Sequence, residues 1–107
     1  MKVHLYDKDW DLTLVRSRYI YNNSLAVLLL DEEGQPFADL TVMLEDSPLH
    51  NDDRHAYVDT NNCPWAPQFL KDSGFAEPTG MVWFSGYCMY PLYKFNIESI
   101  KEEEAWD

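Results

Sequence analysis

The sequence predicts an α+β fold, a mainly antiparallel twisted sheet with one short helix packed on it. Three observations predict this class. Apolar and polar residues alternate with a period of two along several segments, as in strands that bury one face. Clusters of turn-forming residues separate these segments at short intervals. A helical pattern is confined to residues 63–73, in a chain of 107 residues that is 46% hydrophobic and long enough for one core.

The chain is expected to form one domain. No linker, internal repeat or low-complexity segment interrupts it before the C-terminus. We therefore predict a single α+β domain over residues 1–100. Residues 101–107 carry mostly charged side chains, so we expect them to be an acidic, frayed tail.

The first two predicted strands lie on either side of a polar turn. Residues 19–21 and the apolar run 25–30 flank residues 22–24, Asn-Asn-Ser, which are turn-forming types. The second strand ends at residues 31–34, Asp-Glu-Glu-Gly, a hairpin signal because glycine accepts a positive φ. A strand, a turn and a strand are therefore expected in this part of the chain.

Residues 37–44 show the clearest alternation. The even-numbered residues from Ala38 to Leu44 are apolar and face one way, whereas Asp39 and Thr41 face the other. This pattern predicts a half-buried antiparallel strand. Residues 45–55 are mostly polar, and we expect an exposed loop there.

The second half of the chain supplies a short strand at residues 56–60, the helix, and two further strands. The helix is predicted over residues 63–73, with Gly74 just past its end. Residues 81–87 and 93–97 are the last two strands, expected in one sheet with residues 37–44. The expected core comprises the large apolar side chains on these inward faces, namely Leu40, Val42, Trp65, Phe69, Phe84 and Phe95.

The charge of the chain favours some partners and opposes others. Nineteen acidic residues against eight Lys and Arg give a net charge of −11 and a pI near 4.4. This charge opposes direct binding to nucleic acid or to an anionic membrane and favours basic partners. The alternative is that the negative charge serves only solubility. With no apolar run of about 20 residues and no signal-peptide pattern, we expect a soluble, unexported protein of the cytoplasm.

The cysteines and histidines do not form a recognised catalytic or metal-binding motif. Cys63 and Cys88 lie 25 positions apart without a Cys-x-x-Cys pair, so we expect reduced, structural thiols, no metal and no cofactor. A cysteine-dependent enzyme stays open as a remote alternative, with Cys63 as nucleophile, His55 as base and Asp59 as the orienting group. The aromatic run at residues 83–93 suggests base stacking, but Lys94 is the only cation near it, which favours core packing together with a protein-contact patch.

Carboxylates in predicted turns are the candidate partner-binding residues. Consecutive carboxylates in turns point into water, so general acid and base catalysis is the weaker interpretation. Exposure equally lets them contact lysine and arginine on a partner. Because turn carboxylates make few native contacts, reversing the charge of Asp52 and Asp53 should leave the fold stable. The candidate residues are Asp31, Glu32, Glu33, Asp46, Asp52 and Asp53.

Two strings in the sequence point to a family. They are residues 57–65, Tyr-Val-Asp-Thr-Asn-Asn-Cys-Pro-Trp, and residues 84–93, Phe-Ser-Gly-Tyr-Cys-Met-Tyr-Pro-Leu-Tyr. With residues 22–26 and 39–42, they resemble a bacterial family classed as a domain of unknown function and carried on plasmids, integrative elements and prophages. The resemblance covers most of residues 22–97 and implies no catalytic residue.

The resemblance and the charge together suggest a function. Small acidic proteins of mobile elements are similar in type to inhibitors of host defence, including anti-CRISPR proteins. We therefore expect a non-enzymatic inhibitor that binds a basic nucleic-acid-binding surface, with the CRISPR effector Cas9 as the preferred target. The alternative is a mobile-element accessory protein that binds an unknown target, and the oligomeric state stays open.

Overall fold

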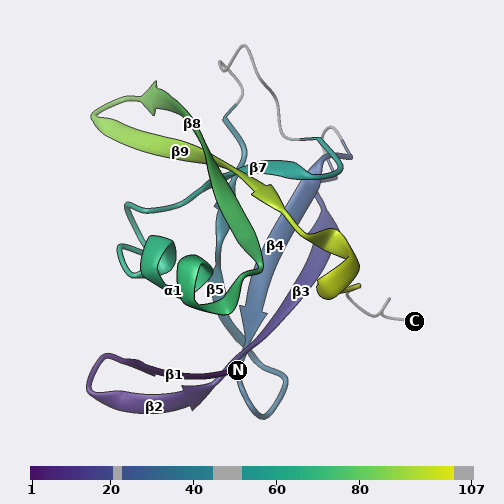
Figure 1. Cartoon of the computed structure of the whole chain (residues 1–107), viewed down its shortest axis with the longest axis vertical. Coiled ribbons are helices and arrows are strands. Elements are labelled where there is room, and N and C mark those ends of the chain that lie inside the picture. Colours follow the sequence, from purple (N-terminus) through teal and green to yellow (C-terminus); the bar gives the residue numbers. More distant parts are fainter. Residues whose placement is uncertain (21–22, 45–51, 103–107) are drawn as a thin grey trace.

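The computed structural model describes residues 1–20, 23–44 and 52–102, and Figure 1 shows the whole chain. The described residues confirm the α+β class, with mostly antiparallel strands and one short α-helix. The strands are β1 (Lys2–Leu5), β2 (Lys8–Asp11), β3 (Thr13–Arg18), β4 (Leu25–Leu30), β5 (Pro36–Asp39), β6 (Thr41–Val42), β7 (His55–Val58), β8 (Ala76–Ser85), β9 (Cys88–Phe95) and β10 (Lys101–Glu102). The helices are α1 (Ala66–Ser73) and the 3-10 helix η1 (Ile97–Ser99).

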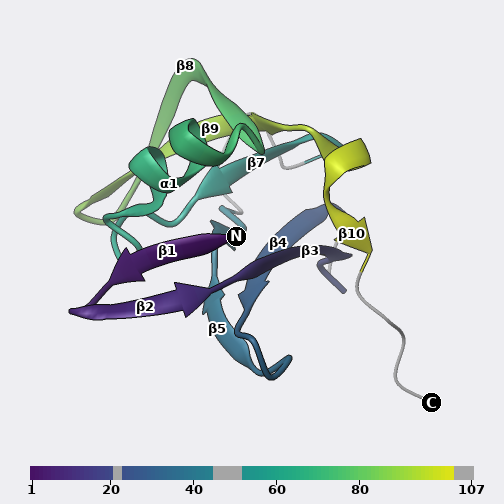
Figure 2. The same cartoon turned by 60° about the horizontal axis from the view of Figure 1, so that its bottom comes forward.

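The strands form two four-stranded sheets and a separate hairpin. The first sheet has the order β10-β3-β4-β5 and the second has the order β6-β7-β9-β8, while β1 and β2 pair with each other. Figure 2 shows the first sheet below the second, with α1 beside the second. The main core cluster contains residues from both sheets and from α1, so it lies between them.

Residues 41–42 lie in one sheet with β8 and β9 as predicted, but the prediction is wrong for β5, because the chain changes sheet at Leu40. Its N–H donates to the Val27 carbonyl of β4 at 3.0 Å, and its carbonyl accepts the Asp59 N–H that follows β7 at 2.9 Å. β5 therefore belongs to the first sheet and β6 to the second. The segment predicted as one strand over residues 37–44 is divided between the two.

Thr41 holds this crossing in place. We expected it to face away from the core, but it is buried, and its Oγ1 accepts the Val27 N–H at 3.0 Å. The Tyr19 hydroxyl lies 2.9 Å from the same oxygen. The side chain of Thr41 thus replaces the backbone partner that β4 loses where β5 ends.

The first predicted strand lies earlier in the chain than residues 19–21. β3 ends at Arg18, and the following chain turns, with the Tyr19 N–H donating to the Ser24 carbonyl at 2.9 Å. Leu14 and Val15 are buried, whereas Ile20 is fully exposed. The apolar residues before the turn, rather than the aromatic ones beside it, therefore make the strand.

Helix α1 starts three residues later than predicted, at Ala66. Cys63 and Trp65 precede it in a turn in which the Ala66 N–H donates to the Cys63 carbonyl at 2.9 Å. Pro67 is tolerated because first-turn N–H groups lack acceptors inside the helix. Gly74 ends the helix in the left-handed region at φ 74° and donates to the Leu70 carbonyl.

Four of the six expected core residues lie in the main core cluster or at its edge. The other two, Val42 and Phe84, lie outside that cluster. Leu40, Phe69 and Phe95 are buried, and Trp65 packs against the main cluster from its edge. Val42 packs against a second, smaller cluster made by Leu44, Tyr57 and Leu92. Phe84 is 66% exposed, so its assignment to the core is wrong.

The position of Phe84 explains the error. In β9, the residues facing the core are Phe95, which is 1% exposed, and Tyr93, which is 5% exposed; Met89 continues the same alternation but is 50% exposed. Phe84 pairs with Met89 across the hairpin. The inner face of the second sheet therefore continues beyond the body that covers its base, and Figure 1 shows the β8–β9 hairpin projecting at the upper left.

The predicted tail begins inside a strand. Lys101 and Glu102 form β10, which pairs in parallel with β3, so residues 101–102 are not frayed. Ile100 is buried, and its carbonyl accepts the Arg16 Nε–H at 3.1 Å, which anchors the chain just before β10. Residues 103–107 of the predicted tail lie outside the described residues.

Candidate functional site

The acidic turn between β4 and β5 presents the first three predicted partner-binding residues. Asp31 shapes the turn, because its Oδ1 accepts the Glu33 and Gln35 N–H groups at 2.9 Å each. Glu32 and Glu33 are exposed, and neither side chain has an ion-pair partner within the described part of the chain. Two carboxylates at this turn are thus available to a partner.

Asp52 and Asp53 are already engaged inside the molecule. Asp52 Oδ1 accepts the Arg54 N–H at 2.8 Å and the His55 N–H at 2.6 Å, and His55 Nδ1 lies 3.1 Å away. Partial burial alone would raise the pKa of Asp52, but these hydrogen bonds outweigh it and hold the pKa below its usual value. Asp53 Oδ1 accepts Arg18 Nη1–H at 2.6 Å. The expectation of few native contacts is therefore wrong for this pair.

The two groups of acids lie at opposite ends of β4. Leu25, at one end, donates its N–H to the Asp52 carbonyl at 2.9 Å, and Leu30, at the other end, precedes Asp31. A six-residue strand is about 17 Å long between its end residues, so the two groups do not form one surface patch. Asp46 lies outside the described residues.

All three arginines of the chain form ion pairs, and each neutralises the charge of one carboxylate. Arg18 pairs with Asp53, and Arg54 donates two hydrogen bonds to Glu98. The Arg54 hydrogen bond is the main cause of a lowered pKa at Glu98. Arg16 Nη1 lies 3.5 Å from Glu102. Charge is thus balanced around Asp52 and Asp53, and it stays negative at the β4–β5 turn.

A cavity of about 400 Å³ opens beside β5, and we call it the acidic cavity. Its carboxylates are Asp39, at the end of β5, and Asp59, just after β7. Both also line a second cavity of about 320 Å³ on the other side, next to Tyr19 and Thr41. The change of sheet at Leu40 brings these two carboxylates together, because Asp59 N–H bonds to the Leu40 carbonyl.

The two carboxylates differ in their partners. Asp59 accepts the Asn62 N–H at 3.2 Å on Oδ1 and the Asn62 side-chain amide at 2.9 Å on Oδ2, so it stabilises the turn before α1. No donor from the described residues is recorded for the carboxylate of Asp39, which is exposed. Asp39 is therefore the carboxylate that a ligand can approach.

Aromatic side chains also line the acidic cavity, namely Tyr6, Phe37 and Trp65. Phe37 lies 6.1 Å from Trp65 and 4.7 Å from Trp10 between ring centroids. Trp65 Nε1–H donates to the Tyr6 hydroxyl at 2.9 Å, which ties the β1–β2 hairpin to the chain before α1. Tyr6 has φ 55° in the hairpin turn, an uncommon conformation for a bulky residue, and this hydrogen bond helps to hold it.

The negative charges of Asp39 and Asp59 disfavour ionisation of the Cys63 thiol beside them. Burial first, and then Asp59 and Asp39, raise the pKa of Cys63 to about 11. Burial likewise raises the pKa of Tyr19, and both acids add to that rise despite a hydrogen bond from Thr41 that opposes it. A carboxylate pair beside aromatic rings suits an organic cation such as a guanidinium or ammonium group.

Only two of the three residues of the cysteine-dependent alternative come together, because Cys63 and Asp59 both line the acidic cavity and His55 does not. Cys63 Sγ donates to the Asp39 carbonyl at 3.7 Å. His55 lies at the start of β7, bonded to Asp52, whereas Asp59 follows the end of that strand. Among residues 1–20, 23–44 and 52–102, no three His, Cys, Asp or Glu side chains are grouped so that they could hold a metal ion.

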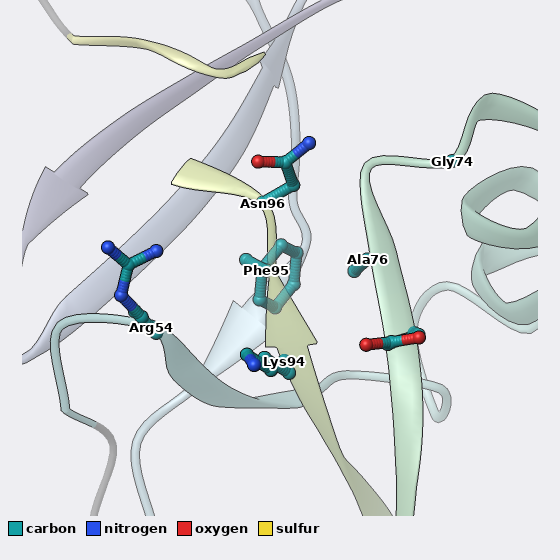
Figure 3. Close-up of a pocket in the computed structure, with 7 residues that line it drawn as sticks. Arg54, Gly74, Ala76, Lys94, Phe95 and Asn96 are labelled. Atoms are coloured by element: carbon teal, nitrogen blue, oxygen red, sulfur yellow. The ribbon is translucent and has the colours of Figure 1, made fainter. Parts of the chain in front are cut away.

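A mixed-charge hollow of about 470 Å³ lies on another part of the surface (Figure 3). Arg54 and Lys94 lie on one side of it, and Ala76 of β8 lies across from them. Arg54 is paired with Glu98, and Lys94 pairs in strand register with Glu77. Because acidic groups already stand next to both cations, this hollow has no strong preference for an anion.

Sequence reasoning missed the acidic cavity. The β1–β2 hairpin was not predicted, although Val3 and Leu5 alternate with polar residues before the turn at Tyr6. Asp59 lies in the string at residues 57–65 and Asp39 in the segment 39–42 of the family resemblance, but nothing in the sequence places them side by side. The change of sheet at Leu40 does so.

Comparison with known proteins identifies the family and no function. No curated protein and no solved structure matches the chain. No helix in the described parts of the chain is long and apolar enough to cross a membrane. The model of a domain of unknown function, DUF4313, matches residues 13–105. The chain therefore belongs to the DUF4313 family.

Proposed function

We propose that this protein is a non-enzymatic inhibitor from a mobile element that binds the basic nucleic-acid-binding surface of a host-defence protein, with Cas9 as the preferred target. The observation that carries the proposal is the uneven compensation of charge. All three arginines are ion-paired, while Glu32, Glu33 and Asp39 have no recorded cationic partner among the described residues. These three carboxylates lie along the β4–β5 side and give it uncompensated negative charge.

This side has the features that a cationic protein surface would meet. The turn at residues 31–35 leads directly into β5, whose Phe37 and Asp39 line the acidic cavity. A lysine or arginine from a nucleic-acid channel fits this cavity because carboxylates attract its charge and aromatic faces pack on its head group. Neighbouring basic residues of the target would contact Glu32 and Glu33.

The binding test uses purified Cas9, with and without guide RNA, in a pull-down followed by a DNA-cleavage assay. We expect binding that weakens as salt rises, because exposed charges are screened, and competition with guide RNA or DNA for the same positive surface. Cleavage that continues unchanged in excess protein would exclude Cas9 and leave an interaction protein with another target.

A pair of matched charge reversals locates the surface. Glu32→Lys with Glu33→Lys should slow association by about 10–100-fold if electrostatic steering operates. The control, Asp72→Lys with Glu77→Lys, changes the net charge equally but lies on α1 and β8, away from the β4–β5 side. Equal losses in both variants would mean that net charge alone matters and that the proposed surface is wrong.

Asp39→Asn tests the cavity itself. The amide keeps the size of the side chain and removes the charge, so we expect weaker target binding with an unchanged urea midpoint. Asp52 and Asp53 are less suitable for such a test, because their loss breaks the turn before β7 and the ion pair with Arg18.

A further inference from the structure

The β8–β9 hairpin carries an apolar face that is left exposed by residues 1–20, 23–44 and 52–102. Its exposed side chains are large: Phe84 is 66% exposed, Tyr87 108% and Met89 50%. Val82 is 43% exposed and lies on the same side of the hairpin as Phe84. Monomeric proteins rarely expose a contiguous apolar patch of this kind without a binding role.

This face is the continuation of the protein's own core surface. Met89 alternates in register with Tyr93 and Phe95, which α1 and the first sheet cover farther along β9. Trp83 and Tyr90, on the opposite face, pack on the second cluster with Tyr57 and Leu92. The hairpin is thus held in shape from one face while the other is left open.

The distribution of charge indicates what covers it. Residues 78–93 contain no Asp, Glu, Lys, Arg or His, although the chain carries a net charge of −11. A basic target finds no carboxylate here to pair with. Two copies of the chain, in contrast, repel each other wherever their acidic surfaces meet and can approach through this uncharged hairpin.

We propose that a second copy of this chain docks on the β8–β9 hairpin, so that the inner faces of the two hairpins cover each other about a two-fold axis. Such a contact is isologous, because the same patch serves both copies. Phe84 and Tyr87 together expose roughly 350 Å² that the contact can bury. With Val82 and Met89 the area stays below the ~800 Å² per partner of a standard interface, which predicts a weak, reversible dimer.

Sedimentation velocity over a dilution series of the full chain, reaching about 1 mM, tests the proposal. We expect a monomer–dimer equilibrium that strengthens as salt rises, because screening reduces the repulsion between two acidic copies. This salt dependence is opposite to that of the proposed target binding, so either result can fail without the other. A monomer at every concentration and at both low and high salt would overturn the dimer.

Matched variants place the contact. Phe84→Ser with Tyr87→Ser should weaken the dimer at least about 10-fold, because exposed aromatic anchors dominate such interfaces. Ile20→Ser, at a side chain that is 103% exposed outside the hairpin, should leave it unchanged. Circular dichroism and the urea midpoint of each variant should match the parent. The proposal is overturned if the hairpin variant dimerises as strongly as the parent. It is also overturned if the protein stays monomeric and the hairpin substitutions abolish Cas9 binding.

Discussion

Replacing Thr41 by valine should destabilise the fold although the two side chains have nearly the same shape. The Thr41 hydroxyl accepts the Val27 N–H at 3.0 Å, and Val27 is 1% exposed. Valine leaves that N–H without an acceptor and without access to water. The free energy of unfolding should therefore fall by about 2 kcal/mol, the usual effect of leaving a buried donor unpaired.

Thr41→Ser is the matched control because it keeps the hydroxyl and removes only a methyl group. Its expected loss is ~1 kcal/mol, the value for about one buried methylene-sized group. Urea denaturation followed by tryptophan fluorescence measures both variants, and the slope m should not change. In thermal melting, the valine variant should lose roughly 8–16 °C, at about 4–8 °C for each kcal/mol in a domain of this size.

A double-mutant cycle with Tyr19→Phe separates the hydrogen bond from shape. The Tyr19 hydroxyl lies 2.9 Å from the Thr41 oxygen, so Tyr19→Phe should be destabilising in the parent and close to neutral beside Thr41→Val. The reasoning is refuted if valine is as stable as threonine, or if the two substitutions add without coupling. Either outcome would mean that the crossing between sheets does not depend on the hydroxyl.

Three further outcomes are expected. Phe95→Ala should lower the free energy of unfolding by ~3–5 kcal/mol through lost burial and a cavity. Phe84→Ala, measured at low protein concentration, should change it by less than about 0.5 kcal/mol. Equal losses in urea denaturation would contradict the burial of Phe95 and the exposure of Phe84. Because the pKa of Asp52 is lower in the folded state, its contribution to stability is present above the unfolded pKa of about 3.9 and is lost as the pH falls through the folded value. Acid denaturation of Asp52→Asn should accordingly be shallower than that of the parent below about pH 4, and superimposable curves would argue against the Asp52 hydrogen bonds. The Cys63 thiol, with a pKa of about 11, should react with a disulfide reagent at pH 8 only as fast as the protein unfolds. The variant with Cys63→Ser and Cys88→Ser should retain target binding. Rapid labelling of native Cys63, or lost binding at unchanged stability, would restore the cysteine-dependent alternative.

Local patterns predicted those elements whose burial follows from their own residues. In the strand predicted at residues 93–97, Tyr93 and Phe95 are buried and Lys94 is exposed, as expected. The strand itself, β9, begins five residues earlier at Cys88 and ends at Phe95, and Ile97 belongs to η1. The apolar run 25–30 is β4, and the strand predicted at residues 56–60 is β7, which runs from His55 to Val58. In each case strand periodicity and neighbouring turn residues agree, so no distant contact is needed to decide the structure.

Local patterns failed where a distant contact decides. Leu40 and Thr41 are both buried because the chain changes sheet between them, and only the positions of β4 and β7 reveal this. Phe84 follows the same alternation as the core residues of β9, but the body of the protein ends before it. A sequence records which face of a strand is apolar, and the length of the covering layer is a property of the whole fold.

The predicted site was limited by the same physics. Composition gave the sign of the surface charge, but ion pairing depends on which arginine lies nearby. Arg18 and Asp53 are 35 positions apart and meet at 2.6 Å, so an acid that looks available in the sequence is compensated in the fold. Glu32 and Glu33 have no such recorded neighbour among the described residues, so they stay the stronger candidates of the six.

Because the two proposed surfaces differ in charge, one experiment can distinguish target binding from self-association. The β4–β5 side is acidic, so its attraction to a basic target decreases as counterions screen it. The β8–β9 hairpin is uncharged, and dimerisation through it is opposed by the same acidic surfaces, so screening favours it. A salt series on a single preparation should therefore shift target binding and self-association in opposite directions. If both weakened with salt, the self-contact would have to be electrostatic, and the hairpin, which has no charged residue between positions 78 and 93, could not supply it.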